Sequence, residues 1–289
     1  MRHFLKITLF LLFVSPAISL AQDGNLSSVE PFKLGTFEIE GTPKVGVVLR
    51  DEFIVDLNAA NQDLESDSAY SSVAMPADMI ELISRYEDGL KNRLYELVNH
   101  LVSENMVTGS NAADYVYAHE DLHTMAPLMY PSKILNAAVN FLSHVNEQGT
   151  EEERAAIQKQ RIENRGVPYL FLKPGRGAVI GASDSIVIPY GRNRTDWEVE
   201  LGTVIGRTGK YISAADAQDY VFGYTVTMDI SDRGGRPPGG GDFTSDWFVG
   251  KGHDTFAPMG PWIVPKEFYG DPMDNLRQTL TVDGEVMQD

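Results

Sequence analysis

Three carboxylates in strand-like surroundings are the strongest candidates for chemistry in this sequence. Glu198 and Glu200 lie two residues apart in a stretch rich in β-branched and aromatic residues, so an extended chain places both on one face. Two such carboxylates repel each other unless a cation lies between them. A solvent-exposed face is the alternative, but Asp229, which ends the apolar run 221–228, favours a three-carboxylate site. All-oxygen donors select a hard cation, Mg²⁺, Mn²⁺ or Ca²⁺.

A histidine and a glutamate three residues apart offer a second kind of chemistry. On one helical turn the side chains of His144 and Glu147 meet, so Glu147 can hold the imidazole in the tautomer that takes a proton from water. The pair follows a predicted strand over 133–139. By itself such a pair is commonly a surface ion pair, which stays the alternative, and the position after a strand adds modest support for a general base.

The glycine- and proline-rich segment 234–241 does not match a phosphate-binding loop. It lacks the Gly-Lys-Ser/Thr of a P-loop, and Pro237 and Pro238 interrupt the glycine spacing of a dinucleotide-binding turn. We interpret the segment as a flexible loop that borders a site.

The elements that must position these residues change in character near residue 130. Before it, alternating apolar residues over 32–57 predict a small antiparallel sheet, and apolar residues every three or four positions from Pro76 to Leu101 predict a helix weakened by Gly89. After it, short β-rich runs are separated by Gly and Pro, and a helix or lid is expected over 147–160. The β-rich runs are 133–139, 169–172, 185–188, 197–205, 221–230, 262–264 and 279–287.

This pattern predicts a mixed, mainly β fold. We expect a small α+β N-terminal domain over residues 22–130 and a barrel or rolled sheet over 131–289. The 289 residues include no cysteine, which excludes disulfide scaffolds, zinc–cysteine sites and thiol nucleophiles. The formal charge of −17 argues against nucleic acid as a partner.

Residues 1–21 read as a secretory signal peptide. Arg2 and Lys6 flank an apolar run, 7–14, that is much shorter than the ~20 residues of a membrane-spanning helix. Cleavage is expected after Ala21. The sequence therefore predicts an exported protein, periplasmic or secreted, with no membrane attachment after cleavage. An uncleaved anchor is the alternative.

Four ordered motifs in the second half resemble those of the fumarylacetoacetate hydrolase family. The family pattern is Gly-x-Asn-Tyr-x-x-His-x-x-Glu, then Glu-x-Glu-Leu, then Gly-Tyr-x-x-x-x-Asp-x-Ser-x-Arg, then Lys-x-x-Asp-Thr-Phe-x-Pro-x-Gly-Pro. The corresponding segments here are 138–147, 198–201, 223–233 and 251–261. The resemblance covers about residues 133–289. It departs from the family at Ala138, Phe141 and the long loop 234–241.

The resemblance implies a β-rich rolled-barrel domain, commonly assembled as a homodimer, and a role for each candidate residue. The implied metal ligands are Glu198, Glu200 and Asp229. The implied catalytic residues are His144, Glu147 and Lys251. The implied substrate-binding residues are Arg233 and Lys251. Family members continue for several strands past the position of Asp289, so the resemblance also implies that the catalytic domain is incomplete at its C-terminus.

The implied activity is that of a divalent-metal-dependent hydrolase. It would cleave a carbon–carbon bond in a small anionic 2-oxo or 1,3-dicarbonyl acid of the acylpyruvate type. A decarboxylase, isomerase, hydratase or dehydratase of a 2-oxo acid is the alternative, because the same metal-enolate chemistry serves each of these reactions. A rival of another class is an exported, non-catalytic metabolite-binding protein. The intact His144 and Glu147 argue against that rival.

Overall fold

The computed structural model describes residues 29–138, 140, 149–163, 166, 168–236 and 246–289. The predicted signal peptide, the pair His144 and Glu147, and most of the glycine- and proline-rich loop lie outside this part. No helix in the described ranges is long and apolar enough to cross a membrane.

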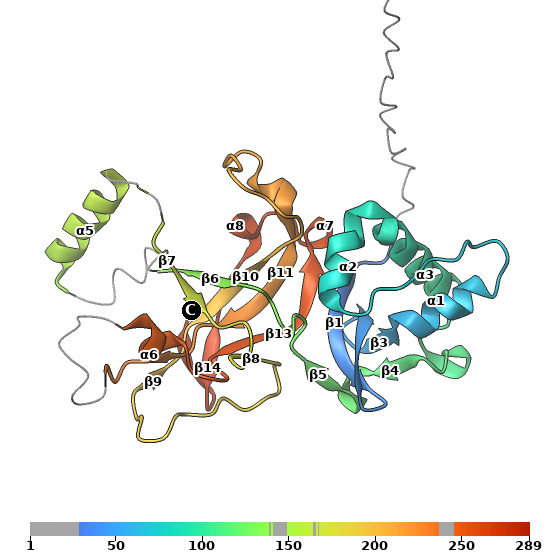
Figure 1. The fold of residues 1–289 in the computed structure, drawn as a ribbon, viewed down its shortest axis with the longest axis horizontal. Coiled ribbons are helices and arrows are strands. Elements are labelled where there is room, and N and C mark those ends of the chain that lie inside the picture. The colour runs from blue at the N-terminus through green and yellow to red at the C-terminus, as the bar shows by residue number, and fades with distance from the viewer. Residues whose placement is uncertain (1–28, 139, 141–148, 164–165, 167, 237–245) are drawn as a thin grey trace, which may run out of the picture.

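The first half of the chain, blue to green in Figure 1, contains short strands and a group of helices. Its strands are β1 (Phe32–Ile39), β2 (Thr42–Leu49), β3 (Phe53–Asp56), β4 (Val116–Ala118) and β5 (His123–Met125). Its helices are α1 (Leu57–Glu65), α2 (Met79–Arg85), the π-helical turn η1 (Tyr86–Leu90), α3 (Lys91–Ser103) and the 3₁₀ turns η2 (Gly109–Asn111) and η3 (His119–Asp121). The long helix predicted from Pro76 is interrupted at Gly89, whose φ of +105° is not helical.

The second half is mainly β. Its strands are β6 (Ile134–Ala137), β7 (Leu170–Lys173), β8 (Val179–Ile180), β9 (Thr195–Asp196), β10 (Val199–Ile205), β11 (Val221–Met228), β12 (Ser231–Asp232), β13 (Ala257–Pro265), β14 (Leu280–Val282) and β15 (Glu285–Gln288). Its helices are α5 (Glu151–Glu163), the 3₁₀ turn η4 (Ala217–Tyr220), α6 (Trp247–Lys251), α7 (Lys266–Tyr269) and α8 (Pro272–Asn275). The strand predicted over 185–188 is wrong. This segment pairs with no strand among the described residues, and the Val187 N–H donates to Thr255 Oγ1 at 2.8 Å.

Strands from both halves pair in one sheet. Its order is β10-β11-β13-β1-β2-β3-β4, with β5 beside β1 and β8 beside β13. Within it, only the pairing of β13 with β8 is parallel among the described strands. The predicted mainly β fold is therefore confirmed, but the sheet is open rather than a closed barrel. Since β1 pairs with β13, the sheet continues across the predicted boundary at residue 130.

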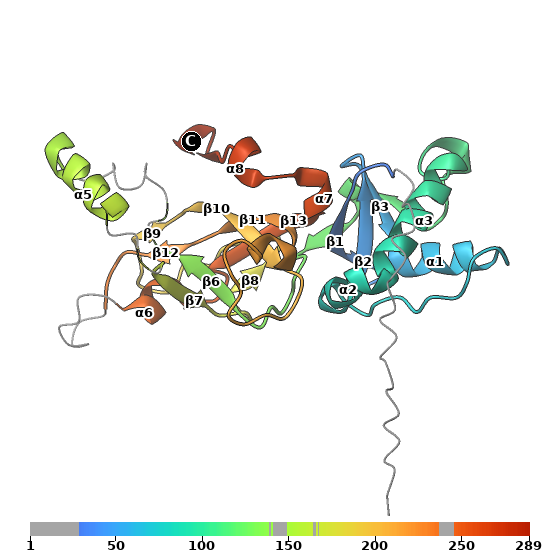
Figure 2. The ribbon, with the colours of Figure 1, turned by 90° about the horizontal axis from the view of Figure 1, so that it is seen from above.

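The helices α1, α2 and α3 cover the first half of this sheet, and the main apolar core lies beneath them (Figures 1 and 2). The core extends into the second half through Val204, Phe222 and Ile263. Tyr86 packs edge-on against Phe222 at 4.9 Å between ring centroids. The end of the sheet formed by β10 and β11 is thus held by packing from the first half of the chain.

Candidate active site

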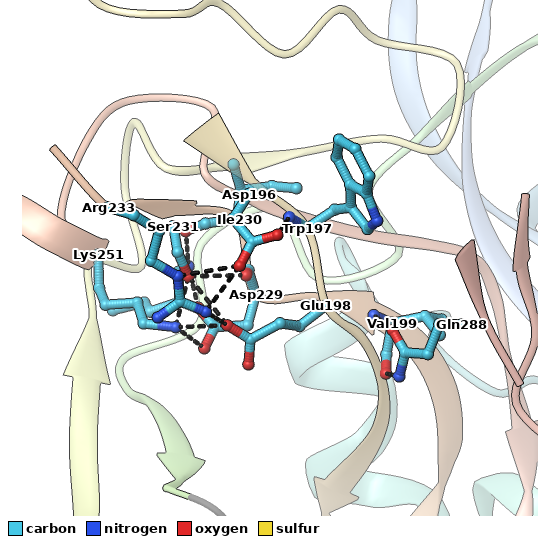
Figure 3. A network of polar contacts seen from close by, with 11 residues as sticks. Asp196, Trp197, Glu198, Val199, Asp229, Ile230, Ser231, Arg233, Lys251 and Gln288 are labelled. Atoms are coloured by element: carbon cyan, nitrogen blue, oxygen red, sulfur yellow. Dashed lines mark hydrogen bonds and ion pairs between the residues drawn. The ribbon is translucent and has the colours of Figure 1, made fainter. Parts of the chain in front are cut away.

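The end of the β10–β11 ladder brings two of the predicted metal ligands together. Val199 pairs with Met228, and the next backbone contact is a hydrogen bond from the Asp229 N–H to the Glu198 carbonyl at 2.9 Å. The Asp229 side chain is buried, and that of Glu198 is about one quarter exposed. The two carboxylates therefore meet at the edge of the protein interior, as Figure 3 shows.

A lysine ammonium joins these two carboxylates. Asp246 caps the start of α6 by accepting from the Val249 N–H, and Lys251 ends that short helix. The buried Lys251 Nζ donates to Asp229 Oδ2 at 2.5 Å and to Glu198 Oε1 at 3.1 Å (Figure 3). Two carboxylate oxygens that contact one nitrogen are close enough to contact one hard cation. The donor chemistry of Glu198 and Asp229 therefore fits Mg²⁺ or Mn²⁺.

Ser231 and Arg233 complete the polar network around Glu198. The Ser231 hydroxyl is 2.5 Å from Lys251 Nζ and 3.2 Å from Glu198 Oε1. The Arg233 guanidinium donates to Glu198 and also to Asp196 Oδ2 at 2.9 Å. The family resemblance implies metal-binding roles for Glu198 and Asp229 and substrate-binding roles for Arg233 and Lys251. These residues lie in one connected group (Figure 3).

Glu200 is two residues further along the chain than Glu198, on β10. It is opposite Thr227 in the ladder, is partly exposed, and lines a groove of about 290 Å³ together with Thr225, Trp262 and Arg277. Among the described residues, no three His, Asp or Glu side chains are close enough to form a ready-made metal site. The role of Glu200 as a third ligand stays a prediction.

A second buried lysine contacts the same aspartate. Lys173 Nζ forms an ion pair with Asp229 Oδ1 and donates to the Ile230 carbonyl at 2.7 Å. Burial lowers the pKa of the Lys173 ammonium to about 8, although the negative charge of Asp229 opposes this shift. Phe171, two residues earlier on β7, lies under Lys251 with 5.1 Å between its ring centroid and Nζ.

A separate buried cluster holds the chain just beyond Ser231. Asp232 accepts from the Gly234 N–H at 2.8 Å and pairs with Arg192, and His253 Nε2 lies 3.6 Å from Asp232 Oδ2. Burial opposes ionisation of Asp232, but the hydrogen bonds from Arg192 and Gly234 outweigh it and lower the pKa of that carboxyl. The cluster therefore fixes the loop that carries Arg233.

Sequence reasoning missed Lys173, Asp232 and Arg192. A signal for Lys173 was present, because it alternates with Leu172 and shares the face of Phe171 in a β-rich run. No local signal connects Arg192 to Asp232, since 40 residues separate them. His144 and Glu147 lie outside the described residues, so their predicted role as base and partner stays a prediction.

Proteins named as hydrolases and tautomerases are similar to this chain in sequence and fold. Residues 133–289 match the family described as Fumarylacetoacetate (FAA) hydrolase C-terminal, and the chain belongs to this family. The resemblance of the four motifs is therefore confirmed.

Relatives with curated functions show the range of the family. Over 173 residues the chain is 36% identical to the mitochondrial oxaloacetate tautomerase FAHD2A of Bos taurus. This match covers 60% of this chain and 50% of that protein. Over 121 residues it is 41% identical to a 2,4-didehydro-3-deoxy-L-rhamnonate hydrolase of Sphingomonas sp. (strain SKA58), covering 42% of this chain and 40% of that protein. The chain thus spans about half the length of curated relatives that it matches.

A solved structure is also similar. The maleylpyruvate hydrolase of Sphingobium sp. SYK-6, in complex with manganese(II) ion and pyruvate, matches with a TM-score of 0.55 and 28% sequence identity. The match covers 83% of this chain and 69% of that one. The bound ion and 2-oxo acid belong to that enzyme, and they are consistent with a divalent metal in this family.

Proposed function

We propose that this protein is a divalent-metal-dependent hydrolase of a small anionic 2-oxo or 1,3-dicarbonyl acid of the acylpyruvate type. The observation that carries the proposal is the pair Glu198 and Asp229, whose oxygens share one ammonium at the end of the β10–β11 ladder. The similarity to a maleylpyruvate hydrolase with manganese and pyruvate supports the substrate class. In this proposal Glu200 is the third ligand.

The metal, Mg²⁺ or Mn²⁺, would supply Lewis acidity toward the 2-oxo-carboxylate end of the substrate. Lys251 and Arg233 would bind the anionic substrate, because both present cationic groups at Glu198. His144 would take a proton from water, whose oxygen adds to the second carbonyl carbon, and Glu147 would stabilise the imidazolium. The carbon–carbon bond then breaks, its electron pair stays with the 2-oxo acid half, and that carbon takes up a proton. Lys251 would offset the negative charge that develops.

Tautomerisation of a 2-oxo acid is the second candidate, favoured by the 36% identity to an oxaloacetate tautomerase. That reaction needs a proton to move between carbon and oxygen, but no bond between carbons breaks. Product analysis separates the two candidates. A hydrolase releases two acids from an acylpyruvate, whereas a tautomerase changes only the enol and keto populations of oxaloacetate.

Metal titration tests the site directly. Glu198→Gln and Asp229→Asn each remove a negative charge from the proposed hard-cation site, so each should weaken Mg²⁺ and Mn²⁺ binding. Isothermal titration calorimetry measures this, with the exposed residue Asp274 changed to Asn as a matched control. If both site variants bind the metal as tightly as the parent chain, Glu198 and Asp229 are not metal ligands. The metal would then bind elsewhere, or these residues would form only a structural polar network.

Export and homodimer formation are further proposals, supported respectively by the sequence of residues 1–21 and by the family resemblance. Mass spectrometry of the protein from its host should find Gln22 or a near neighbour at the N-terminus. Soluble cytoplasmic protein that retains Met1 would contradict export. Sedimentation analysis measures the oligomeric state.

A further inference from the structure

Lys173 is a buried charged group to which the proposed mechanism gives no task. Its side chain is 1% exposed, and the side chain of its partner Asp229 is 3% exposed. Burial of a lysine ammonium is costly unless its protons find acceptors. Here Nζ has two acceptors that come from adjacent residues, the Asp229 carboxylate and the Ile230 carbonyl.

The two oxygens of Asp229 are divided between two lysines. Oδ1 accepts from Lys173, and Oδ2 accepts from Lys251, which also contacts Glu198. The Ile230 contact ties Lys173 to the backbone just beyond β11. Rotation of the Asp229 carboxylate would therefore break its bond to Lys173, so Oδ2 is held on the side of Glu198.

The strand β7 supplies this contact from outside the main sheet. Among the described strands it pairs with β6, and its residues alternate between the two faces. Phe171 and Lys173 are buried on the inner face and contact Lys251 and Asp229 respectively, whereas Leu170 and Leu172 are exposed. One face of β7 thus supports both charged groups at the end of β11.

We propose that Lys173 is a positioning residue of the metal site, which holds Asp229 so that its Oδ2 faces Glu198. This inference rests on the proposed function, in which Asp229 is a metal ligand. Partners that fix the orientation of a ligand typically change metal affinity by about 10- to 100-fold when they are removed.

A purely electrostatic role predicts the opposite sign. An ammonium beside a cation site repels the cation, so removal of that charge alone would tighten metal binding. Loss of positioning weakens it. The direction of the change in affinity therefore separates a positioning residue from a passive counter-charge.

The experiment measures Mn²⁺ affinity by isothermal titration calorimetry for the full chain and for Lys173→Met, which keeps most of the length of the side chain but removes its donors. We expect about 10- to 100-fold weaker binding. Lys173→Arg restores charge and donors and should recover part of this loss. The exposed Lys210, changed to Met, is the matched control and should bind Mn²⁺ as the parent chain does. Equal or tighter binding by Lys173→Met would overturn the inference.

A second variant covers the case in which Lys173→Met does not fold, which circular dichroism and urea unfolding would reveal. Lys173→Gln keeps an N–H donor without the charge, and its shorter side chain cannot reach both acceptors. Weaker Mn²⁺ binding by this variant supports positioning, and equal or tighter binding contradicts it. If the parent chain itself binds no Mn²⁺, the proposed function fails and takes the inference with it. If the parent chain binds and the Lys173 variants bind equally well, only the inference fails.

Discussion

The two halves of the sheet are stabilised by different kinds of contact. In the half that contains β1–β4 and α1–α3, most buried side chains are apolar and form a large cluster and a small one, although Asp56 and Arg93 are also buried there. At the far end of β10 and β11, the buried side chains include Lys173, Asp229, Asp232 and Lys251. Burial of apolar area stabilises the first half. In the second half, the burial of charged groups at the site offsets part of that stabilisation.

Exposed apolar side chains show the same contrast. In the described part of the chain, all but two of the large exposed apolar residues lie after residue 130. Leu135 and Leu172, which are paired across β6 and β7, are both more than half exposed. The first half is therefore a scaffold with a well-buried apolar core, and the second half holds the candidate site on strands with fewer buried apolar residues.

The largest expected effect concerns the proposed base. His144→Ala should lower turnover of an acylpyruvate substrate by about 10²- to 10⁴-fold, the usual contribution of a general base, and leave Mn²⁺ affinity nearly intact. Glu147→Gln should lower turnover less, because in the proposed mechanism Glu147 orients the imidazole without carrying the transferred proton. Steady-state kinetics with His100→Ala as control checks this. Near-normal turnover in His144→Ala would contradict the role of His144 as the general base. The alternative, a surface ion pair of His144 and Glu147, would then hold.

A change in the apolar half should have the opposite profile. Leu94 is fully buried in α3, so Leu94→Ala should lower the free energy of unfolding by about 2–5 kcal/mol. Mn²⁺ affinity should stay the same, because the site lies at the other end of the sheet. Urea unfolding and calorimetry measure the two quantities, and Ile80→Ala, at an exposed position of α2, is the control. A large loss of Mn²⁺ affinity in folded Leu94→Ala would show that the apolar half also determines metal binding, and would contradict the separate roles of the two halves.

The smallest expected effect is a decrease in the free energy of unfolding at alkaline pH, caused by the tyrosines at the contact between the halves. Tyr86 donates to Glu267 Oε1 at 2.6 Å, and Tyr95 lies 3.5 Å from the same oxygen. Burial and then the charge of Glu267 raise the pKa of Tyr95 to about 12 and that of Tyr86 further still. The folded chain keeps these protons while the unfolded chain loses them, so this contribution to the free energy of unfolding falls between about pH 10 and pH 12.

Comparison with Tyr95→Phe isolates this effect, because other titrating groups contribute equally to both proteins. The free energy of unfolding in urea should fall less steeply with pH in the variant than in the parent chain. If the free energy of unfolding changes with pH equally in both proteins, the proton of Tyr95 does not contribute to the contact between the halves.

Short-range patterns were enough to predict much of this protein. The alternation over 32–57, the helical spacing on both sides of Gly89 and the β-rich run 197–205 each depend on neighbours within a few residues. Such patterns reflect backbone geometry and the burial of one face. The four motifs were also readable, since each keeps its chemical groups within one short segment.

The arrangement of the site required the tertiary structure. The pairing of β1 with β13, the two lysines on Asp229 and the pair of Arg192 with Asp232 join residues far apart in the chain. Local patterns contain no information about such partners, because a buried charge is tolerated wherever the fold supplies its counter-charge. The same reason explains the error at 185–188, where a short β-branched run pairs with no strand in the described part of the chain and is irregular.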